Sequence, residues 1–270
     1  MKRDKFIYEF FIKIIIISLI IPIGTLVLWS FTERWPWPHM KPTSFNMRSI
    51  GYVFRSNDFF HVLYNSLAIS FIVTILTNLI SIPAGKAIGV YDFKGKELIK
   101  ALIMVPIIVP IVAVSMGIHI TFIKVGLANN MVGVIIVQLV VTLPYSIKIL
   151  TSAFENIKDK FEIQGQVLGA NRFQQFRYIT LPLIMPSLIS SSSLVFVISF
   201  SQYFLTILIG GGRVITYSMV MFPFIQSGDR SLGSAYGIVF IIITLVVLFL
   251  LDIVTKTYYR MEKYTCPKSK

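Results

Sequence analysis

The chain has 270 residues, of which 55% are hydrophobic and only 14% are charged. Ordinary soluble domains carry about 25% charged residues, so this composition excludes a soluble globular enzyme, and the apolar content excludes intrinsic disorder. The pattern is typical of an integral membrane protein. The net charge of +13 is then better explained by topology than by nucleic-acid binding, because membrane proteins concentrate Lys and Arg in their cytoplasmic loops.

Six stretches free of Asp, Glu, Lys and Arg are long enough to cross a bilayer, which takes about 20 apolar residues. In chain order they are residues 14–32, 62–85, 101–123, 125–147, 178–212, which forms one span with a lead-in, and 231–251. A further uncharged stretch, 214–228, is short and contains Pro223. We expect it to lie at the interface or to dip into the membrane without crossing it.

The distribution of Lys and Arg predicts the orientation of these spans. One side holds the N-terminus, the loops 86–100 and 148–177 and the C-terminal tail, with eighteen of the 25 cations. Because cytoplasmic loops are enriched in Lys and Arg, we expect this side, with both termini, to be cytoplasmic. The first span follows three cations as a secretory signal would. It is long and no cleavage site precedes Glu33, so we interpret it as a retained anchor.

The loop 148–177 is longer and more polar than the other loops. Its pattern predicts a helix over 153–168 that Gly169 ends, because glycine tolerates a left-handed conformation. Asn171 can cap a second short helix. The apolar face of that helix would hold Phe173, Phe176 and Ile179. Exposed apolar residues on such a helix-turn-helix are costly in water and imply a docking partner.

This loop also carries a family motif. Gly169, followed after nine residues by Ile179-Thr180-Leu181-Pro182, resembles the G-x9-I-x-L-P half of the EAA motif. That motif marks permease subunits of binding-protein-dependent ABC importers. Where the family shows Glu-Ala-Ala, this chain has Ile163, Gln164 and Gly165; Glu162 stands one residue earlier and Gly165 keeps a small side chain. The likeness covers about residues 60–255 and includes Pro83-Ala84-Gly85-Lys86-Ala87 at the end of the second span.

The resemblance implies an all-α, polytopic type I importer permease with six transmembrane helices. Its parts would be an N-terminal anchor helix and outer loop (1–59), a permease core (60–256) with a cytoplasmic coupling loop (150–182), and a cytoplasmic tail (257–270). In the family this loop sits in a groove of a cytoplasmic ATPase and transmits its closure to the spans. The residues that the resemblance assigns to this coupling are Glu162, Gly165, Gly169, Ala170, Arg172, Phe173, Ile179, Leu181 and Pro182.

The resemblance also implies the partners and the location. The partners would be a dimer of ABC ATPases, a second permease subunit that is either a related chain or a second copy, and a substrate-binding protein outside the membrane. The location would be the lipid bilayer of the bacterial cytoplasmic membrane. The substrate would be a small solute of the polyamine, thiamine-like, iron(III) or phosphonate class. ATP and magnesium would belong to the partner, because Gly85-Lys86 here is followed by Ala87 and forms no phosphate-binding loop. We expect no cofactor or metal on this chain and no nucleic-acid partner.

Polar residues in lipid usually face the protein interior, so those in the fourth and fifth spans are candidates for the lining of a translocation path. They are Gln138, Thr142, Ser199, Ser201, Gln202 and Thr206. The alternative is that Ser and Thr bond their own helix backbone. On the outer side, Arg213 and Arg230 flank the segment 214–228 and are candidates for docking the binding protein.

Two other functions stay open from the residues alone. An ATP-independent secondary transporter or channel would need neither Glu162 nor Gly169; proton coupling is disfavoured because no acid or base lies in the middle of a span. For a membrane-embedded enzyme, the sequence lacks any catalytic constellation.

Gly85 and Gly89, like Gly233 and Gly237, are spaced so that they could bring helices close together, a pattern that is frequent by chance.

Overall fold

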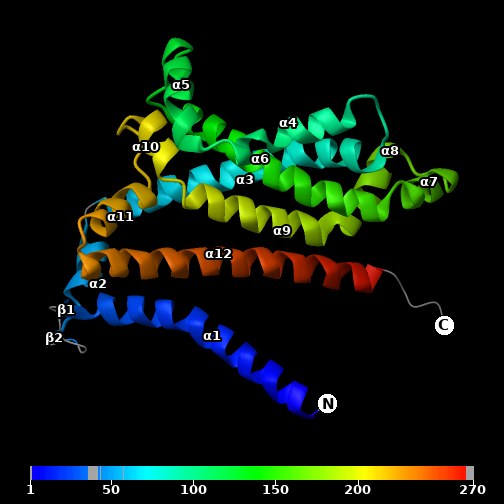
Figure 1. Cartoon of the computed structure of the whole chain (residues 1–270). Helices are drawn as coiled ribbons and strands as arrows, with labels where there is room; N and C mark the ends of the chain where they lie inside the picture. The colour runs from blue at the N-terminus through cyan, green and yellow to red at the C-terminus, as the bar shows by residue number, and fades with distance from the viewer. Residues whose placement is uncertain (1, 36–41, 43, 57, 266–270) are drawn as a thin grey trace. The chain divides into compact units, whose positions relative to one another are not determined.

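The computed structural model describes residues 2–35, 42, 44–56 and 58–265 and is almost entirely helical (Figure 1). In chain order the elements are α1 (Lys2–Ser30), β1 (Thr32–Arg34), β2 (Ser44–Phe45), α2 (Arg48–Arg55), α3 (Phe59–Val90), α4 (Lys96–Ile108), α5 (Ile111–Lys124), α6 (Met131–Ile157), α7 (Lys160–Val167), α8 (Arg172–Gln175), the π-helix η1 (Phe176–Thr180), α9 (Leu181–Phe200), α10 (Phe204–Gly210), α11 (Tyr217–Gln226) and α12 (Arg230–Thr265). They form two compact units, residues 1–62 with 219–243 and residues 63–218 with 244–270.

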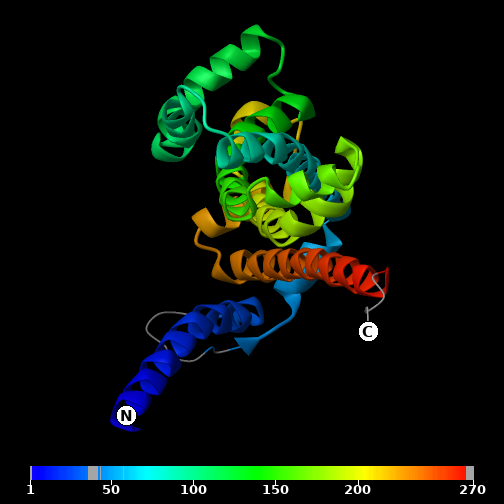
Figure 2. The same cartoon turned by 90° about the vertical axis from the view of Figure 1, so that its right-hand side faces the viewer.

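In the part of the chain that the structure describes, five segments are long and apolar enough to cross a membrane: Tyr8–Ser30, Phe59–Val90, Met131–Ile157, Arg172–Phe200 and Arg230–Val254. A sixth span is possible if α4 and α5 count as one broken span, since the two helices meet at 99°. Figures 1 and 2 show how sharply α5 turns away from α4. The predicted third span, residues 101–123, is therefore divided between two helices. Pro110 has no N–H to continue α4, and Val109 before it adopts the extended backbone that a following proline favours.

The predicted fifth span also ends earlier than expected. Its helix stops at Phe200, and α10 begins as a separate short helix at Phe204. Between them the N–H of Gln202 bonds the carbonyl of Ser199, which tightens the last turn and lets the chain change direction. The stretch 214–228 contains a short helix, α11, with Pro223 inside it, as expected for a segment too short to cross a membrane.

The predicted all-α class is confirmed, and one small antiparallel sheet is present besides the helices in the described residues. In the first unit, β1 pairs with β2, with Thr32 opposite Phe45. The amide of Asn46, just after β2, donates a hydrogen bond to the carbonyl of Phe31 (2.8 Å). The hydroxyl of Ser231, at the start of α12, donates one to the carbonyl of Thr32 in β1 (2.6 Å). These bonds fix the chain at the end of α1.

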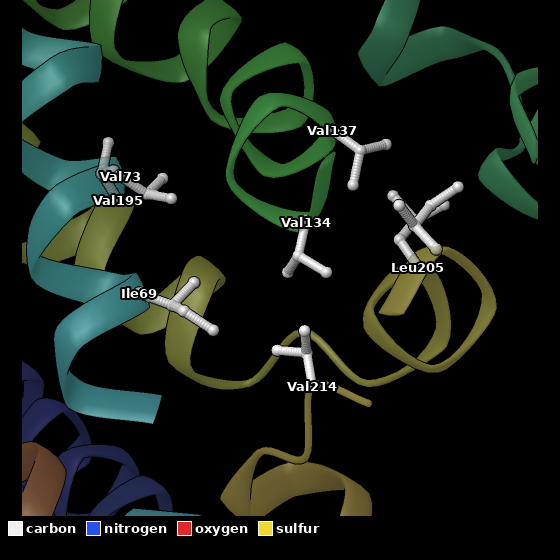
Figure 3. Close-up of a cluster of buried hydrophobic side chains, with 8 residues drawn as sticks. Ile69, Val73, Val134, Val137, Val195, Leu205 and Val214 are labelled. Carbon is white, nitrogen blue, oxygen red and sulfur yellow. The ribbon is translucent and has the colours of Figure 1, made fainter. Parts of the chain in front are cut away.

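The core of the second unit lies where α3, α6, α9 and α10 converge, and α6 and α9 pack along much of their lengths. Figure 3 shows its aliphatic side chains, which are all buried: Ile69, Val73, Val134, Val137, Val195, Leu205, Ile209 and Val214. Helices in lipid gain little from hydrophobic exclusion, so they associate through close van der Waals packing.

Two glycines bring α3 against α6 at even closer range. A β-carbon on Gly85 would lie 2.9 Å from Cβ of Leu150, and one on Gly89 would lie 2.8 Å from the carbonyl oxygen of Thr151. No larger residue fits at either place without moving a backbone. The Gly85–Gly89 spacing is therefore a true helix contact, whereas Gly237 has no atom within 4 Å of such a position.

Candidate functional site

The loop that the sequence singles out begins where α6 ends. The N–H of Lys158 bonds the carbonyl of Phe154 (2.8 Å), and Lys158 itself has φ of 54°. The predicted uninterrupted helix over 153–168 is wrong, because this left-handed residue breaks it into the end of α6 and the separate helix α7. Left-handed conformations are uncommon for residues other than glycine and mark a sharp change of direction.

The turn from α7 to α8 follows the prediction. Gly169 has φ of +84°, so it ends α7 as expected. Asn171 begins α8 with a reciprocal capping box: its Oδ1 accepts from the amide of Gln174 at 2.9 Å, and its own amide donates to Oε1 of Gln174 at 2.9 Å. Local turn chemistry alone thus sets the geometry of the second helix.

The short helix α8 runs without a break into the span α9 through the π-helix η1. In this segment the N–H of Leu181 bonds the carbonyl of Phe176, five residues back. Proline at 182 has no N–H to donate, and the wider π turn accommodates this at the start of α9. Residues 172–200 therefore form one helical rod that connects the loop directly with the membrane span.

An ion pair joins α7 to the end of α3. Nζ of Lys86 lies 2.8 Å from Oε1 and 2.6 Å from Oε2 of Glu162. The hydroxyl of Thr180, in η1, donates a short hydrogen bond to Oε1 of the same carboxylate. Burial by itself raises the pKa of Glu162, but the hydrogen bonds from Lys86 and Thr180, together with the charge of Lys86, outweigh it and leave the pKa below its ordinary value.

Gly165 provides the second attachment of α7. It is the one buried residue of this helix, and the tip of the Ile179 side chain fills the space that a β-carbon at 165 would take. The turn is closed further by Gln175, whose Nε2 donates to the carbonyl of Ala170 at 2.7 Å. These contacts bring together five of the predicted coupling residues, with Pro182 connected through η1. They are Glu162, Gly165, Ala170, Ile179 and Pro182.

The exposed surface of this loop carries large apolar side chains among polar ones. Val167 and Leu168 are 82% and 87% exposed, and Phe173 is 73% exposed. Arg172 is exposed beside them, and Leu181 is half-buried at the start of α9. Between α7, α8 and the end of α3 lies a polar pocket of about 370 Å³. Its lining includes Lys86, Tyr91, Asp159, Glu162, Gln166, Arg172 and Gln175. Such a surface can receive a protein partner that offers both apolar and charged groups.

The predicted path residues fall into two groups. Four of them are buried, and each bonds a side chain of another helix: Gln138, Thr142, Ser199 and Thr206. Gln138 donates to Thr206 at 3.0 Å and accepts from Ser199, while the hydroxyls of Thr142 and Thr77 lie 2.9 Å apart. Ser201 is exposed, and Gln202, half-buried, accepts bonds through its backbone carbonyl. The first group holds α3, α6, α9 and α10 together; a lining role for these residues stays a prediction.

A second buried polar cluster escaped the sequence interpretation. Asn78 of α3 donates to Ser192 at 3.0 Å, and its Oδ1 accepts from Ser191 at 2.8 Å and from Ser146 at 3.2 Å. An asparagine in the middle of an apolar span was the available signal, since such a group needs partners in lipid. Its partners come from α6 and α9, far away in the sequence, so the pattern alone does not identify them.

The two arginines predicted to dock the binding protein have different surroundings. Arg213 is exposed and follows the left-handed pair Gly211 and Gly212. In the first unit, the guanidinium of Arg230 lies 5.2 Å from the ring centroid of Trp29, which stacks on Trp35 at 4.6 Å. This cation–π contact holds Arg230 against the end of α1.

Residues 78–260 match the family described as the binding-protein-dependent transport system inner membrane component, and the chain belongs to this family. The match takes in all of α4 to α11, including the loop from Lys158 to Pro182. The predicted family, its permease class and its membrane location are thereby confirmed. Among the described residues, no three His, Cys, Asp or Glu side chains gather as metal ligands would.

Curated relatives carry several substrate names. The chain is 31% identical over 130 residues to the molybdate/tungstate transport system permease protein WtpB of Pyrococcus abyssi, a match to about half of either chain (48% of this chain, 52% of the relative). It is 28% identical to the spermidine/putrescine permease PotB of Haemophilus influenzae, covering 75% of this chain and 74% of that one. It is 24% identical to the putative 2-aminoethylphosphonate permease PhnV of Salmonella typhi, covering 89% and 91%.

Solved structures show the same fold. A bacterial ABC transporter involved in the import of the acidic polysaccharide alginate superimposes with a TM-score of 0.67 at 16% identity, over 96% of this chain and 97% of that chain. The MetNI methionine ABC transporter in an inward-facing conformation gives a TM-score of 0.56 at 15% identity, over 76% and 98%. The predicted type I importer permease fold is confirmed.

Proposed function

We propose that this chain is the permease subunit of an ATP-binding-cassette importer. It would carry a small charged solute, delivered by a binding protein outside the membrane, and ATP hydrolysis on separate subunits would drive the step. The observation that carries the proposal is the loop from Lys158 to Pro182: a capped helix that exposes Phe173 and continues through η1 into the membrane span α9. A rigid rod of this kind can convert a push on its exposed end into movement of the span.

The coupling residues take two roles in this proposal. Arg172 and Phe173 are exposed and would touch the ATPase. The other coupling residues would set the shape of the loop, because they lie at its ion pair, its tight contact, its turn or its junction with α9. They are Glu162, Gly165, Gly169, Ala170, Ile179, Leu181 and Pro182. ATP and magnesium would be bound by the partner. The loop and both termini would face the cytoplasm, as the distribution of Lys and Arg favours.

The remaining assignments complete the proposed assembly. The chain would act as an anchor region (1–59), a permease core (60–256) and a tail (257–270), paired with a second permease subunit that we propose is a related chain. The relatives named above are permeases for an oxyanion, a polyamine and an aminophosphonate, so a small charged solute is the shared class. The outer loops, with Arg213 and Arg230, would receive the binding protein.

The test is gentle purification of the chain from its native membrane, followed by mass spectrometry of the proteins that come with it. We would compare Gly169→Val with the matched variant Gly212→Val, because both glycines have a left-handed φ and open space around them. The two differ in place, since Gly212 lies at the other end of the second unit's long helices, in the turn after α10. A β-branched residue strains either turn. An ATPase and a second permease should accompany the unaltered chain and Gly212→Val, and be lost with Gly169→Val.

A chain that is recovered alone would favour the second candidate, an ATP-independent transporter or channel. So would an ATPase whose recovery is indifferent to Gly169→Val. The identity of a co-purified binding protein would point to the substrate, since the binding protein selects the solute before the permease receives it.

A further inference from the structure

The helix α7 lies between two joints, where the helical path of the backbone is broken. Before it lies Lys158 with φ of 54°, and after it lies Gly169 with φ of +84°; both residues end the helical path on their side. Eight residues are too few for a helix to be stable by itself in water. The position of α7 must therefore be set by its contacts with other elements, of which the ion pair of Glu162 and the packing of Gly165 are the ones described above.

Lys86 stands on a rigid base. It follows Gly85 directly, and the close approach of Gly85 and Gly89 to Leu150 and Thr151 locks this part of α3 against α6. Any shift of the Lys86 backbone would force α3 into the backbone of α6 or away from it. The side chain of Lys86 thus extends from a fixed point in the membrane-spanning bundle.

The ammonium group reaches both oxygens of the Glu162 carboxylate. The distances are 2.6 and 2.8 Å, and the two side chains are only 30% and 19% exposed, so water screens the pair less than a surface pair. The Thr180 hydroxyl bonds the same carboxylate from η1. Charge-assisted bonds of this geometry are the strong ones. One carboxylate therefore links three elements: α3, α7 and the rod that η1 begins.

We infer that Lys86 is a positioning residue of the coupling loop, holding α7 at a fixed angle between the end of α3 and the π-helix η1. Without its ammonium group, Glu162 keeps one hydrogen bond, from Thr180, and α7 can turn about Lys158 and Gly169. The packing of Gly165 on Ile179 still retains the helix loosely. A push on α7 would then be absorbed by the joints and would not reach α3.

The role in coupling rests on the proposed function, but the placement of α7 can be measured on the purified chain in lipid nanodiscs. The single cysteine, Cys266, is replaced by Ser, and a nitroxide label is attached to Gln164→Cys, an exposed position on α7. Lys86→Gln should raise the undocked, mobile fraction of the label about tenfold, which is the effect expected for loss of a hydrogen bond to a charged group. The reciprocal pair Lys86→Glu with Glu162→Lys should restore the immobile spectrum.

Lys100→Gln is the matched control, because Lys100 also forms an ion pair, with Glu97, but within a single helix (3.2 Å). It should leave the label immobile. A label that stays immobile in Lys86→Gln overturns the inference, whatever partners the chain has. So does a mobile label that the reciprocal pair fails to immobilise.

In the assembled importer, Lys86→Gln should lower the solute imported per ATP hydrolysed several-fold, and the reciprocal pair should restore the ratio. An unchanged ratio with a mobile label would overturn the coupling role. If the label is released but the chain proves to have no ATPase partner, Lys86 still positions α7, and it is the proposed function that fails.

Discussion

The δ-methyl end of Ile179 occupies the space beside Gly165 where any other residue would place its β-carbon. This contact packs α7 against the rod that runs into α9. Since the obstructing atom is the end of a flexible side chain, and alanine favours a helix by about 1 kcal/mol over glycine, Gly165→Ala should change the melting temperature of the purified chain little. Gly165→Val should lower it, because overpacking costs about 1–3 kcal/mol.

The control for this pair is Gly117→Val in α5, where nothing lies within 4 Å of the position of a new β-carbon. It should have a smaller effect than Gly165→Val. Equal losses at positions 117 and 165 would contradict the close contact with Ile179.

The turn at Gly169 makes a different demand. Space is free there, so the cost of a substitution comes from the backbone alone. Gly169→Ala should destabilise the turn by about 1–2 kcal/mol, and Gly169→Asn by less, because asparagine tolerates the left-handed region. Amide hydrogen exchange of α7 and α8 is the measurement. Protection that falls equally for Ala and Asn would mean that the side chain, and not φ, matters at this position.

The turn from α7 to α8 was predictable from the sequence because its causes are local. A glycine that ends a helix and an asparagine that caps the next one act within one or two turns of chain, and the structure has both where they were expected. The lengths of the spans follow from composition in the same way. The breaks after Phe200 and at Lys158 were not predictable, since no proline or glycine marks either place.

The attachments of the loop could not be predicted because they are distant in sequence. Lys86 and Glu162 are separated by 76 positions, and Asn78 and its partner Ser191 by 113. A charged residue at the end of a span is usually explained as a membrane anchor, and single polar residues in spans have many potential partners. Only the packing of α3 on α6 and α9 determines which of them meet.

The ion pair of Glu162 should be stable at neutral pH. Because the pKa of Glu162 is lowered in the folded chain, the pair contributes to stability above the ordinary carboxyl pKa of 4.5 and is lost only as the pH falls through the lower folded value. A nitroxide at Gln164→Cys should therefore stay immobile from pH 7 to 5 and become mobile in more acidic solution. In Lys86→Gln the dependence on pH should weaken, because one of the two groups that lower the pKa of Glu162 is gone.

Asp159 is a second carboxylate in the polar pocket that Glu162 and Arg172 line, so Asp159→Asn is the control for this titration. It should leave the midpoint in place. A midpoint above pH 4.5 in the otherwise unaltered chain would contradict the lowered pKa of Glu162.

Gln138 tests whether the buried polar residues of α6 serve structure or transport. Gln138→Leu removes the bonds to Ser199 and Thr206, and interhelical bonds of this kind in membranes contribute about 0.6–1.7 kcal/mol each. We expect a clear fall in the melting temperature. Ser201→Ala, at an exposed position, should leave stability unchanged. If Gln138→Leu melts normally but imports a different range of solutes, Gln138 lines the path instead of bracing it.

Arg230 is held over Trp29, and this contact gives a way to separate docking from packing. If Arg230 receives the binding protein, Arg230→Ala should weaken the stimulation of ATP hydrolysis by that protein and leave the basal rate unchanged. Trp29→Leu keeps the charge but releases the guanidinium, since it removes a cation–π contact of about 0.5–1 kcal/mol. It should weaken stimulation less than Arg230→Ala, because a mobile arginine can still find its partner. If both variants lower the melting temperature and leave stimulation intact, Arg230 fastens α12 to the end of α1 and the binding protein docks elsewhere.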